Sequence, residues 1–146
     1  MALELLHEFS LVHDDIQDGD RARRHRPTLW TIIGVPQAIN TGDALFALAH
    51  LALLHQSGSP SPPDRLVRAL RRFNEATLGL AIGQHLDMSF EARRQVTPEQ
   101  YLEMVRGKTG ALLALAGEVG AMIGGAPPEA CDHLRALGER LGMAFQ

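Results

Sequence analysis

The chain is organised around the stretch His13-Asp14-Asp15-Ile16-Gln17-Asp18-Gly19-Asp20, which runs directly into Arg21-Ala22-Arg23-Arg24-His25-Arg26-Pro27-Thr28. Upstream of the acids, apolar residues recur at spacings of three and four, which predicts an amphipathic helix with the acids on its last turn. These apolar residues are Leu3, Leu6, Phe9, Val12 and Ile16. Gly19 is a typical helix stop, so the basic residues should follow in a connecting segment.

The three acids of this helix end are expected to repel one another. Asp14 and Asp18 lie one above the other on a helix, with Asp15 about a quarter turn round. Each like-charged pair costs roughly 0.2–0.5 kcal/mol, and acids near a helix C-terminus also oppose the helix dipole. A cation is therefore expected here. Mg²⁺ typically takes one or two carboxylates together with water and phosphate oxygens.

The arginines that follow suit a phosphate, because a guanidinium presents a planar fork of donors. A plainer alternative is that these acids and arginines neutralise one another on a solvated loop, where exposed pairs contribute about 0–1 kcal/mol. The order of the residues favours the first interpretation. His-Asp-Asp-x-x-Asp followed by Arg-Arg-x-Arg-Pro-Thr resembles the first aspartate-rich region of the trans-type isoprenyl diphosphate synthases, the polyprenyl synthetase family.

Composition agrees with a single helical domain. The chain has 146 residues, of which 45% are apolar and 5% aromatic, and abundant Leu and Ala favour helices over a β-sandwich. The net charge of −3 gives no reason to expect nucleic-acid binding. No apolar run approaches the ~18–20 residues of a membrane span. The single Cys131 fits a reducing compartment, so we expect a soluble, cytoplasmic protein.

Periodicity predicts about five helices. They lie before Gly19 and over residues 37–56, 64–90, 97–124 and 127–146. The basic residues Arg65, Arg68, Arg71 and Arg72 of the third are expected to form a solvated face. With the resemblance, this predicts an all-α bundle of the isoprenoid synthase type. The helix over residues 37–56 is apolar almost all round, which suits a core helix or a subunit interface. The resemblance favours the interface and a homodimer, and Gly42-Asp43-Ala44-Leu45 is similar to the family's Gly-Asp-x-Leu segment.

Two further motifs carry polar residues on predicted helices. In Gly83-Gln84-His85-Leu86-Asp87, Gln84 and Asp87 share a face, which in isolation describes a surface pair. The segment resembles the family's Gly-Gln-x-x-Asp element, which lines the reaction cavity opposite the first aspartates. Gly107-Lys108-Thr109-Gly110 lacks the earlier glycine of a P-loop, so Lys108 is either a surface lysine or a family residue. In the family, a Lys-Thr pair in mid-helix faces the allylic diphosphate.

The resemblance implies an Mg²⁺-dependent prenyltransferase that condenses an allylic diphosphate with isopentenyl diphosphate. Asp14, Asp15 and Asp18 would hold Mg²⁺ and with it the allylic diphosphate. Arg23 would join that grip, and Arg24 would hold the isopentenyl diphosphate.

The remaining roles follow from the same resemblance. Lys108 would stand beside the leaving group, Gln84 and Thr109 would turn polar atoms to the carbocation, and Asp87 would line the substrate cavity. The residue five before Asp14 lies beneath the growing prenyl chain in this family. Here it is Phe9, with Ser10 next, a pattern that resembles enzymes making the C20 geranylgeranyl diphosphate.

The resemblance spans residues 1–146 but only the middle of the family's length. We expect a single partial domain that lacks the family's N-terminal helices and its C-terminal part with the second Asp-Asp-x-x-Asp motif. Such a chain alone should be inactive or nearly so. His25 stands where the family usually has glycine, the residue that adopts positive φ most readily.

Other functions remain open on the residues alone. A His-Asp phosphohydrolase has His13-Asp14 as its only support, because no upstream pair of metal-binding histidines exists in the chain. A cyclising terpene synthase would share the helices and the aspartates, although the arginine run favours chain elongation. A non-catalytic alternative is a truncated remnant or one half of a split enzyme.

Overall fold

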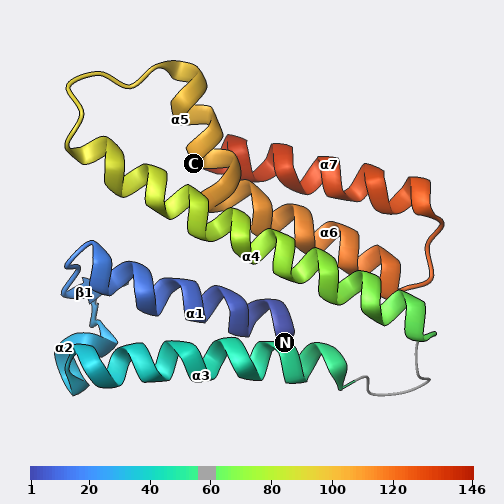
Figure 1. Ribbon diagram of the computed structural model, residues 1–146, viewed down its shortest axis with the longest axis horizontal. Coiled ribbons are helices and arrows are strands. Elements are labelled where there is room, and N and C mark those ends of the chain that lie inside the picture. The colour runs from blue at the N-terminus through green and yellow to red at the C-terminus, as the bar shows by residue number, and fades with distance from the viewer. Residues whose placement is uncertain (56–61) are drawn as a thin grey trace. The chain divides into compact units, whose positions relative to one another are not determined.

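The computed structural model describes residues 1–55 and 62–146 and divides into two compact units, Met1–Gln56 and Ser57–Gln146 (Figure 1). The first unit contains the helices α1, Ala2–Gln17, and α3, Val35–Leu54, with a short hairpin and the helix α2, Leu29–Ile33, between them. The second contains α4, Pro63–Glu91, α5, Pro98–Val105, the π-helical segment η1, Arg106–Gly110, α6, Ala111–Ile123, and α7, Pro128–Phe145. We describe each unit by itself.

In the first unit, α1 packs along α3. The two helices touch closely where Gly42 of α3 faces His13 of α1. A Cβ atom built on Gly42 would lie 2.3 Å from Nε2 of His13, so a larger residue there would require the His13 ring to move. Leu6 of α1 and Ala38 and Ala49 of α3 are fully buried. The small residues of α3 therefore set how closely α1 can lie against it.

The connection after α1 is more ordered than the sequence indicated. Strands β1, Ala22–Arg23, and β2, Arg26–Pro27, pair antiparallel, with Arg23 opposite Arg26. Arg24 and His25 form the two-residue turn and have φ of 50° and 63°. Two-residue hairpin turns of this kind need positive φ at both positions. His25, which stands where the family usually has glycine, thus occupies a left-handed backbone position.

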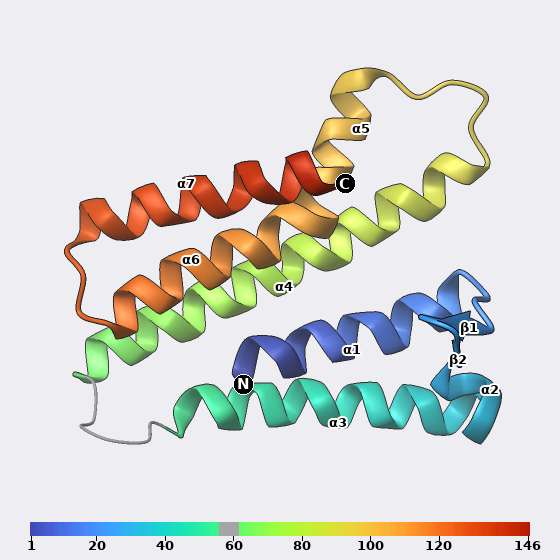
Figure 2. The ribbon, with the colours of Figure 1, turned by 180° about the vertical axis from the view of Figure 1, so that it is seen from behind.

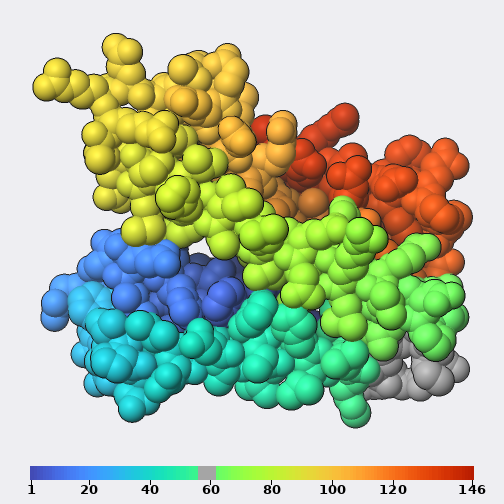
Figure 3. Space-filling model, in the orientation of Figure 1, coloured from blue at the N-terminus to red at the C-terminus, as the bar shows by residue number. Residues whose placement is uncertain are grey.

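In the second unit, α6 lies between α4 and α7, as both ribbon views show (Figures 1 and 2). The segment after α4 and the start of α5 project from this unit (Figure 3). The residues Thr97-Pro98-Glu99-Gln100 have the pattern of a helix start, and α5 begins there. The backbone N–H of Gln100 donates to Oγ1 of Thr97 at 3.3 Å, and the N–H of Thr97 donates to Oε1 of Gln100 at 3.0 Å. This reciprocal capping satisfies two donors at the helix start.

Glycines allow α6 and α7 to approach each other at backbone distance. A Cβ atom on Gly117 of α6 would lie 2.4 Å from the carbonyl oxygen of Leu134, and one on Gly138 of α7 would lie 2.2 Å from that of Leu113. Close packing thus accounts for Gly117 in the middle of a helix. It does not account for Gly120, where no neighbouring atom of the described chain lies within 4 Å of an added Cβ.

The all-α prediction is confirmed, and each predicted helix has a counterpart in the described chain. The helix predicted over residues 97–124 needs correction, because the π-helical turn η1 divides it and residues 97 and 124 are its caps. The helix predicted to end at residue 56 is described as far as Leu54, and residue 56 itself lies outside the described residues. Among the residues that the structure describes, no helix is long and apolar enough to cross a membrane.

Gly138→Ala should destabilise the second unit by about 1–3 kcal/mol, because the added methyl group meets a backbone carbonyl that cannot move independently of its helix. Gly120→Ala is the matched control. Its methyl group enters open space, and replacing a helical glycine by alanine should raise the free energy of unfolding by up to about 1 kcal/mol. Urea unfolding followed by circular dichroism measures both. Equal stability of the two variants would contradict this account of the α6–α7 contact.

Candidate functional site

The acids at the end of α1 share one guanidinium. Nε of Arg23 donates to Oδ1 of Asp15 at 2.7 Å, and Nη2 of Arg23 donates to Oδ2 of Asp14 at 2.9 Å. The hairpin makes this possible, because it turns the chain back so that β1 lies beside the helix end from which it departs. The two neighbouring carboxylates therefore already converge on a cation.

Burial strengthens this pairing. The side chain of Asp15 is only 9% exposed and that of Asp14 18%. Burial by itself lowers the pKa of the Arg23 guanidinium, but the hydrogen bond and charge of Asp15, followed by those of Asp14, outweigh it and raise that pKa above its ordinary value. Arg23 therefore stays protonated and keeps both acids compensated.

The other predicted residues of this unit lie around the cluster. Asp18 is exposed at the C-cap of α1, where its backbone N–H donates to the carbonyl oxygen of Asp14 at 2.8 Å. Arg24 is exposed in the hairpin turn. The carbonyl oxygen of Asp20 accepts from Oγ1 of Thr28 and from Nε1 of Trp30, both at 2.7 Å. These last two bonds tie the loop to α2 and hold the hairpin in place.

Phe9 stands on α1 in a row of rings. Its centroid lies 4.9 Å from that of His13 and 5.0 Å from that of Phe46 on α3. Ser10, the next residue, donates through Oγ to the carbonyl oxygen of His7 at 2.7 Å. The ring of Phe9 is thus fixed by its neighbours, whereas the hydroxyl of Ser10 is satisfied within its own helix.

In the second unit, the predicted residues meet at η1. Nζ of Lys108 donates to Oδ2 of Asp87 on α4 at 2.5 Å, and Oγ1 of Thr109 donates to Oε1 of Gln146 at 2.6 Å. Gln84 lies three residues before Asp87 on the same helix. The structure therefore brings Asp87 and Lys108 together. The convergence of this group with Asp14 and Asp15 in a single cavity stays a prediction.

The donor set of the first unit suits a hard divalent cation. Asp14 and Asp15 offer carboxylate oxygens, which Mg²⁺ prefers, and they already hold a positive group between them. Within the described ranges, no group of three or more His, Cys, Asp or Glu side chains is arranged to hold a metal ion. His13 packs against Gly42. Among the described residues, Asp14, Asp15 and Asp18 are thus not assembled as a three-carboxylate metal site, and their metal role stays a prediction.

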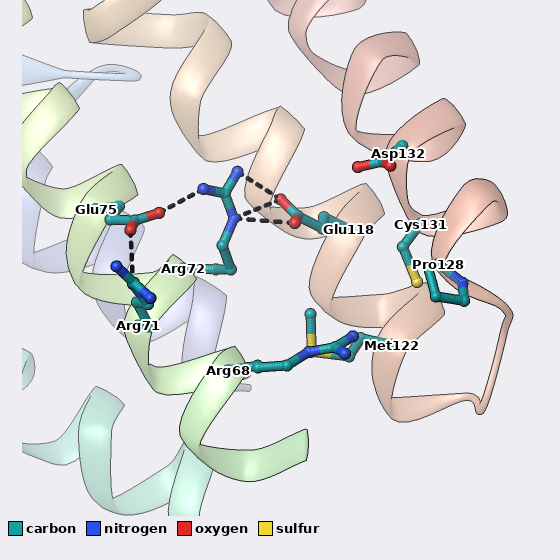
Figure 4. A pocket seen from close by; sticks show the side chains of 9 residues that line it. All are labelled: Arg68, Arg71, Arg72, Glu75, Glu118, Met122, Pro128, Cys131 and Asp132. Carbon is teal, nitrogen blue, oxygen red and sulfur yellow. Dashed lines mark hydrogen bonds and ion pairs between the residues drawn. The ribbon is translucent and has the colours of Figure 1, made fainter. Parts of the chain in front are cut away.

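A pocket of about 360 Å³ lies in the second unit between α4, α6 and α7, and neither Asp87 nor Lys108 lines it (Figure 4). Arg72 stands there between two acids (Figure 4). Its Nε lies 2.9 Å from both carboxylate oxygens of the buried Glu118, and it also pairs with Glu75. The hydrogen bond to Glu118, opposed by burial, raises the pKa of Arg72. The expected solvated face is thus wrong for Arg72, which compensates a buried carboxylate that the sequence did not reveal.

The polyprenyl synthetase family model matches residues 1–146. The chain belongs to the polyprenyl synthetase family. It is 46% identical over its whole length to a (2E,6E)-farnesyl diphosphate synthase of Mycobacterium tuberculosis, of which it covers 39%. It is 42% identical over 99% of its length to a geranylgeranyl diphosphate synthase of the same organism, of which it covers 40%.

Solved structures agree with the family membership. The polyprenyl synthetase of Streptomyces coelicolor superposes with a TM-score of 0.89 at 49% identity, covering 99% of this chain and 41% of the other. The geranylgeranyl pyrophosphate synthetase of Pyrococcus horikoshii gives a TM-score of 0.94 at 43% identity, covering 99% and 43%. The predicted isoprenoid synthase type of helical fold is thereby confirmed. The chain spans about two fifths of the length of these curated relatives.

Sequence reasoning missed several contacts of this polyprenyl synthetase chain. It did not pair Lys108 with Asp87, and it gave no role to Gln146 or to the glycines that face η1. A recognisable signal was present, because Gly83 precedes Asp87 by one helical turn and Gly142 precedes Gln146 by the same interval. A glycine and a polar residue four apart lie on one helix face.

Arg23→Met should tighten the binding of Mg²⁺ by about tenfold or more in the absence of diphosphate, because it removes the positive charge that occupies Asp14 and Asp15. Arg26→Met is the control. It removes the same charge from the hairpin, and in the described structure Arg26 makes no ion pair with either acid. Titration calorimetry with MgCl₂ measures both. Unchanged affinity in Arg23→Met would show that the guanidinium does not compete with the metal.

Proposed function

We propose that this chain supplies the diphosphate-binding part of an Mg²⁺-dependent prenyltransferase that joins an allylic diphosphate to isopentenyl diphosphate. The observation that carries the proposal is the convergence of Asp14 and Asp15 on the guanidinium of Arg23. Its nitrogens lie 2.7 Å from Oδ1 of Asp15 and 2.9 Å from Oδ2 of Asp14. Membership of the polyprenyl synthetase family supports it, as do the farnesyl and geranylgeranyl diphosphate synthases among its relatives.

In this proposal Asp14, Asp15 and Asp18 hold Mg²⁺, which when bound neutralises the diphosphate and makes it a better leaving group. Arg23 then exchanges its carboxylate partners for diphosphate oxygens, because a guanidinium fits either kind of acceptor bidentately. Arg24, exposed in the adjacent turn, holds the isopentenyl diphosphate. The hairpin thus presents one arginine to each substrate.

The reaction needs charge stabilisation and no protein nucleophile. The bond between the allylic carbon and the diphosphate oxygen breaks. The alkene of isopentenyl diphosphate then forms a carbon–carbon bond to the resulting cation, and the condensed cation loses a proton to the departed diphosphate. Lys108 and Arg23 stabilise the negative charge that develops on the departing diphosphate. Gln84 and Thr109 turn polar atoms toward the allylic cation. Asp87 holds the ammonium group of Lys108 until the diphosphate arrives.

For the product, we propose the C20 geranylgeranyl diphosphate. Phe9 is held by Phe46 at a centroid distance of 5.0 Å, so its ring makes a firm floor for a growing chain. The relatives include both farnesyl and geranylgeranyl diphosphate synthases. The assignment therefore depends on Phe9 and Ser10 and not on overall similarity.

We also propose that the protein is a cytoplasmic homodimer that pairs through α3. This helix leaves leucines partly exposed along its second half, namely Leu48, Leu51 and Leu54. Contiguous apolar surface of this kind is typical of protein interfaces.

We expect the isolated chain to be inactive or nearly so, because it carries one aspartate cluster of the family's two. Purified chain supplied with Mg²⁺, farnesyl diphosphate and isopentenyl diphosphate should turn over far more slowly than an ordinary rate of about 1 s⁻¹. A chimera in which residues 1–146 replace the matching segment of the Mycobacterium tuberculosis farnesyl diphosphate synthase should be active. In that chimera, Asp14→Asn should lower kcat by about 10²–10³ or more.

Glu4→Gln, on the opposite end of α1, is the matched control for this loss of charge and should leave kcat unchanged. An inactive chimera would argue for the non-catalytic alternative. An active chimera insensitive to Asp14→Asn would contradict the assigned metal role.

Phe9→Ala in the chimera should lengthen the products beyond C20, because it removes the ring that closes the space beneath the prenyl chain. Phe46→Leu is the control, since it loosens the packing around Phe9 but leaves the floor in place. Chromatography of the dephosphorylated products measures the chain length. An unchanged distribution in Phe9→Ala would refute the floor assignment.

A further inference from the structure

The π-helical segment η1 is held between two helices by glycines. On the side of α4, a Cβ atom built on Gly83 would lie 2.2 Å from the backbone nitrogen of Lys108 and 2.7 Å from the carbonyl carbon of Gly107. On the side of α7, a Cβ atom on Gly142 would lie 2.7 Å from the Cα atom of Gly110 and 3.0 Å from the carbonyl oxygen of Thr109. Backbone therefore touches backbone on both flanks of the segment.

Each glycine is followed one helical turn later by the side chain that holds η1. Four residues after Gly83, Asp87 accepts from Nζ of Lys108. Four residues after Gly142, Gln146 accepts from Oγ1 of Thr109. Residues four apart lie on the same helix face. Each glycine thus allows its helix to approach η1 closely enough for the polar residue one turn later to reach a side chain of η1.

The wide turn of η1 adds to this dependence. Isolated π-helical turns are rare and persist where the surrounding structure favours them. Gly107 also faces α4, because a Cβ atom on it would lie 2.8 Å from the carbonyl oxygen of Gly79 and 3.0 Å from the Cα atom of Gly83. A methyl group at Gly83 would have to displace η1 itself, since the atoms in its way are backbone.

We infer that Gly83 and Gly142 are positioning residues, which seat η1 so that Asp87 aims Lys108 and Gln146 aims Thr109. The effect of this positioning on catalysis rests on the proposed function, in which Lys108 binds the diphosphate. The positioning of Lys108 and Thr109 by the glycines does not depend on that function. Gly83 would act on the reaction only through Lys108, and Gly142 only through Thr109.

Lys108 is the sole lysine of the chain, which makes the inference directly measurable. Protein grown on lysine labelled with ¹³C at Cε gives one side-chain signal. While the ammonium group is held by Asp87, the two Hε protons should have different chemical shifts. Asp87→Asn, which removes the charged partner, should make them equivalent and supplies the reference for a released side chain.

Gly83→Ala should make the two Hε protons equivalent, as Asp87→Asn does, while helicity and cooperative melting are kept. The double variant Gly83→Ala with Asp87→Asn should show no further change. Gly79→Ala is the matched control on α4. Its Cβ would meet only the Cβ of Ala111, at an ordinary 3.4 Å, and the Lys108 signal should stay split. A split signal in a folded Gly83→Ala protein would overturn the inference.

Binding of inorganic diphosphate in the presence of Mg²⁺ provides the second measurement. Gly83→Ala should weaken it by about tenfold, the loss expected for a misplaced charged donor. Gly142→Ala should leave it unchanged, because Thr109 is assigned to the allylic cation. In the active chimera Gly142→Ala should lower kcat, and Gly142→Ala with Thr109→Val should be no slower than Thr109→Val alone. Unfolding of both alanine variants would show that these glycines serve the fold alone and would also overturn the inference. If the unaltered chain binds no diphosphate, the proposed function fails for this segment, and the Lys108 signal alone decides the role of Gly83.

Discussion

Like charges gathered at one end of a helix constrain the whole first unit. Asp14 and Asp15 are close in sequence and largely buried, and their helix end is itself electronegative. The guanidinium of Arg23 compensates the negative charge of both side chains. The hairpin, its left-handed turn at Arg24 and His25, and the ties from Asp20 to α2 together deliver Arg23 to that place.

In the second unit, a single cationic side chain is compensated by an acid from a neighbouring helix. Lys108 carries its charge in the middle of a helical run, and Asp87 compensates it across the contact between α4 and η1. Both units therefore keep a cationic side chain paired with acid in the absence of ligand. Under the proposed function, a diphosphate would compete for each cation and a divalent metal for each acid, so that binding would exchange existing ion pairs.

Glycine contacts make the second of these ion pairs possible. The helices α4, η1 and α7 approach at backbone distance through Gly83, Gly107 and Gly142. Glycine inside a helix costs up to about 1 kcal/mol relative to alanine, so such positions need a compensating contact. Gly120, which has open space around it, shows that a helical glycine does not by itself predict one.

The sequence by itself determined the helical class, the main helix ranges, the capping of α5 and the family, because these depend on local periodicity and on the order of residues in short motifs. It also placed Asp14 and Asp15, and Gln84 and Asp87, on shared helix faces, since neighbours on a helix follow from its geometry. Only the tertiary structure decided that Arg23 returns to Asp14 and Asp15, that Arg72 compensates Glu118, and that η1 is π-helical. Each of these joins residues separated in the chain through a turn or a helix contact, and periodicity carries no information on how closely two helices approach.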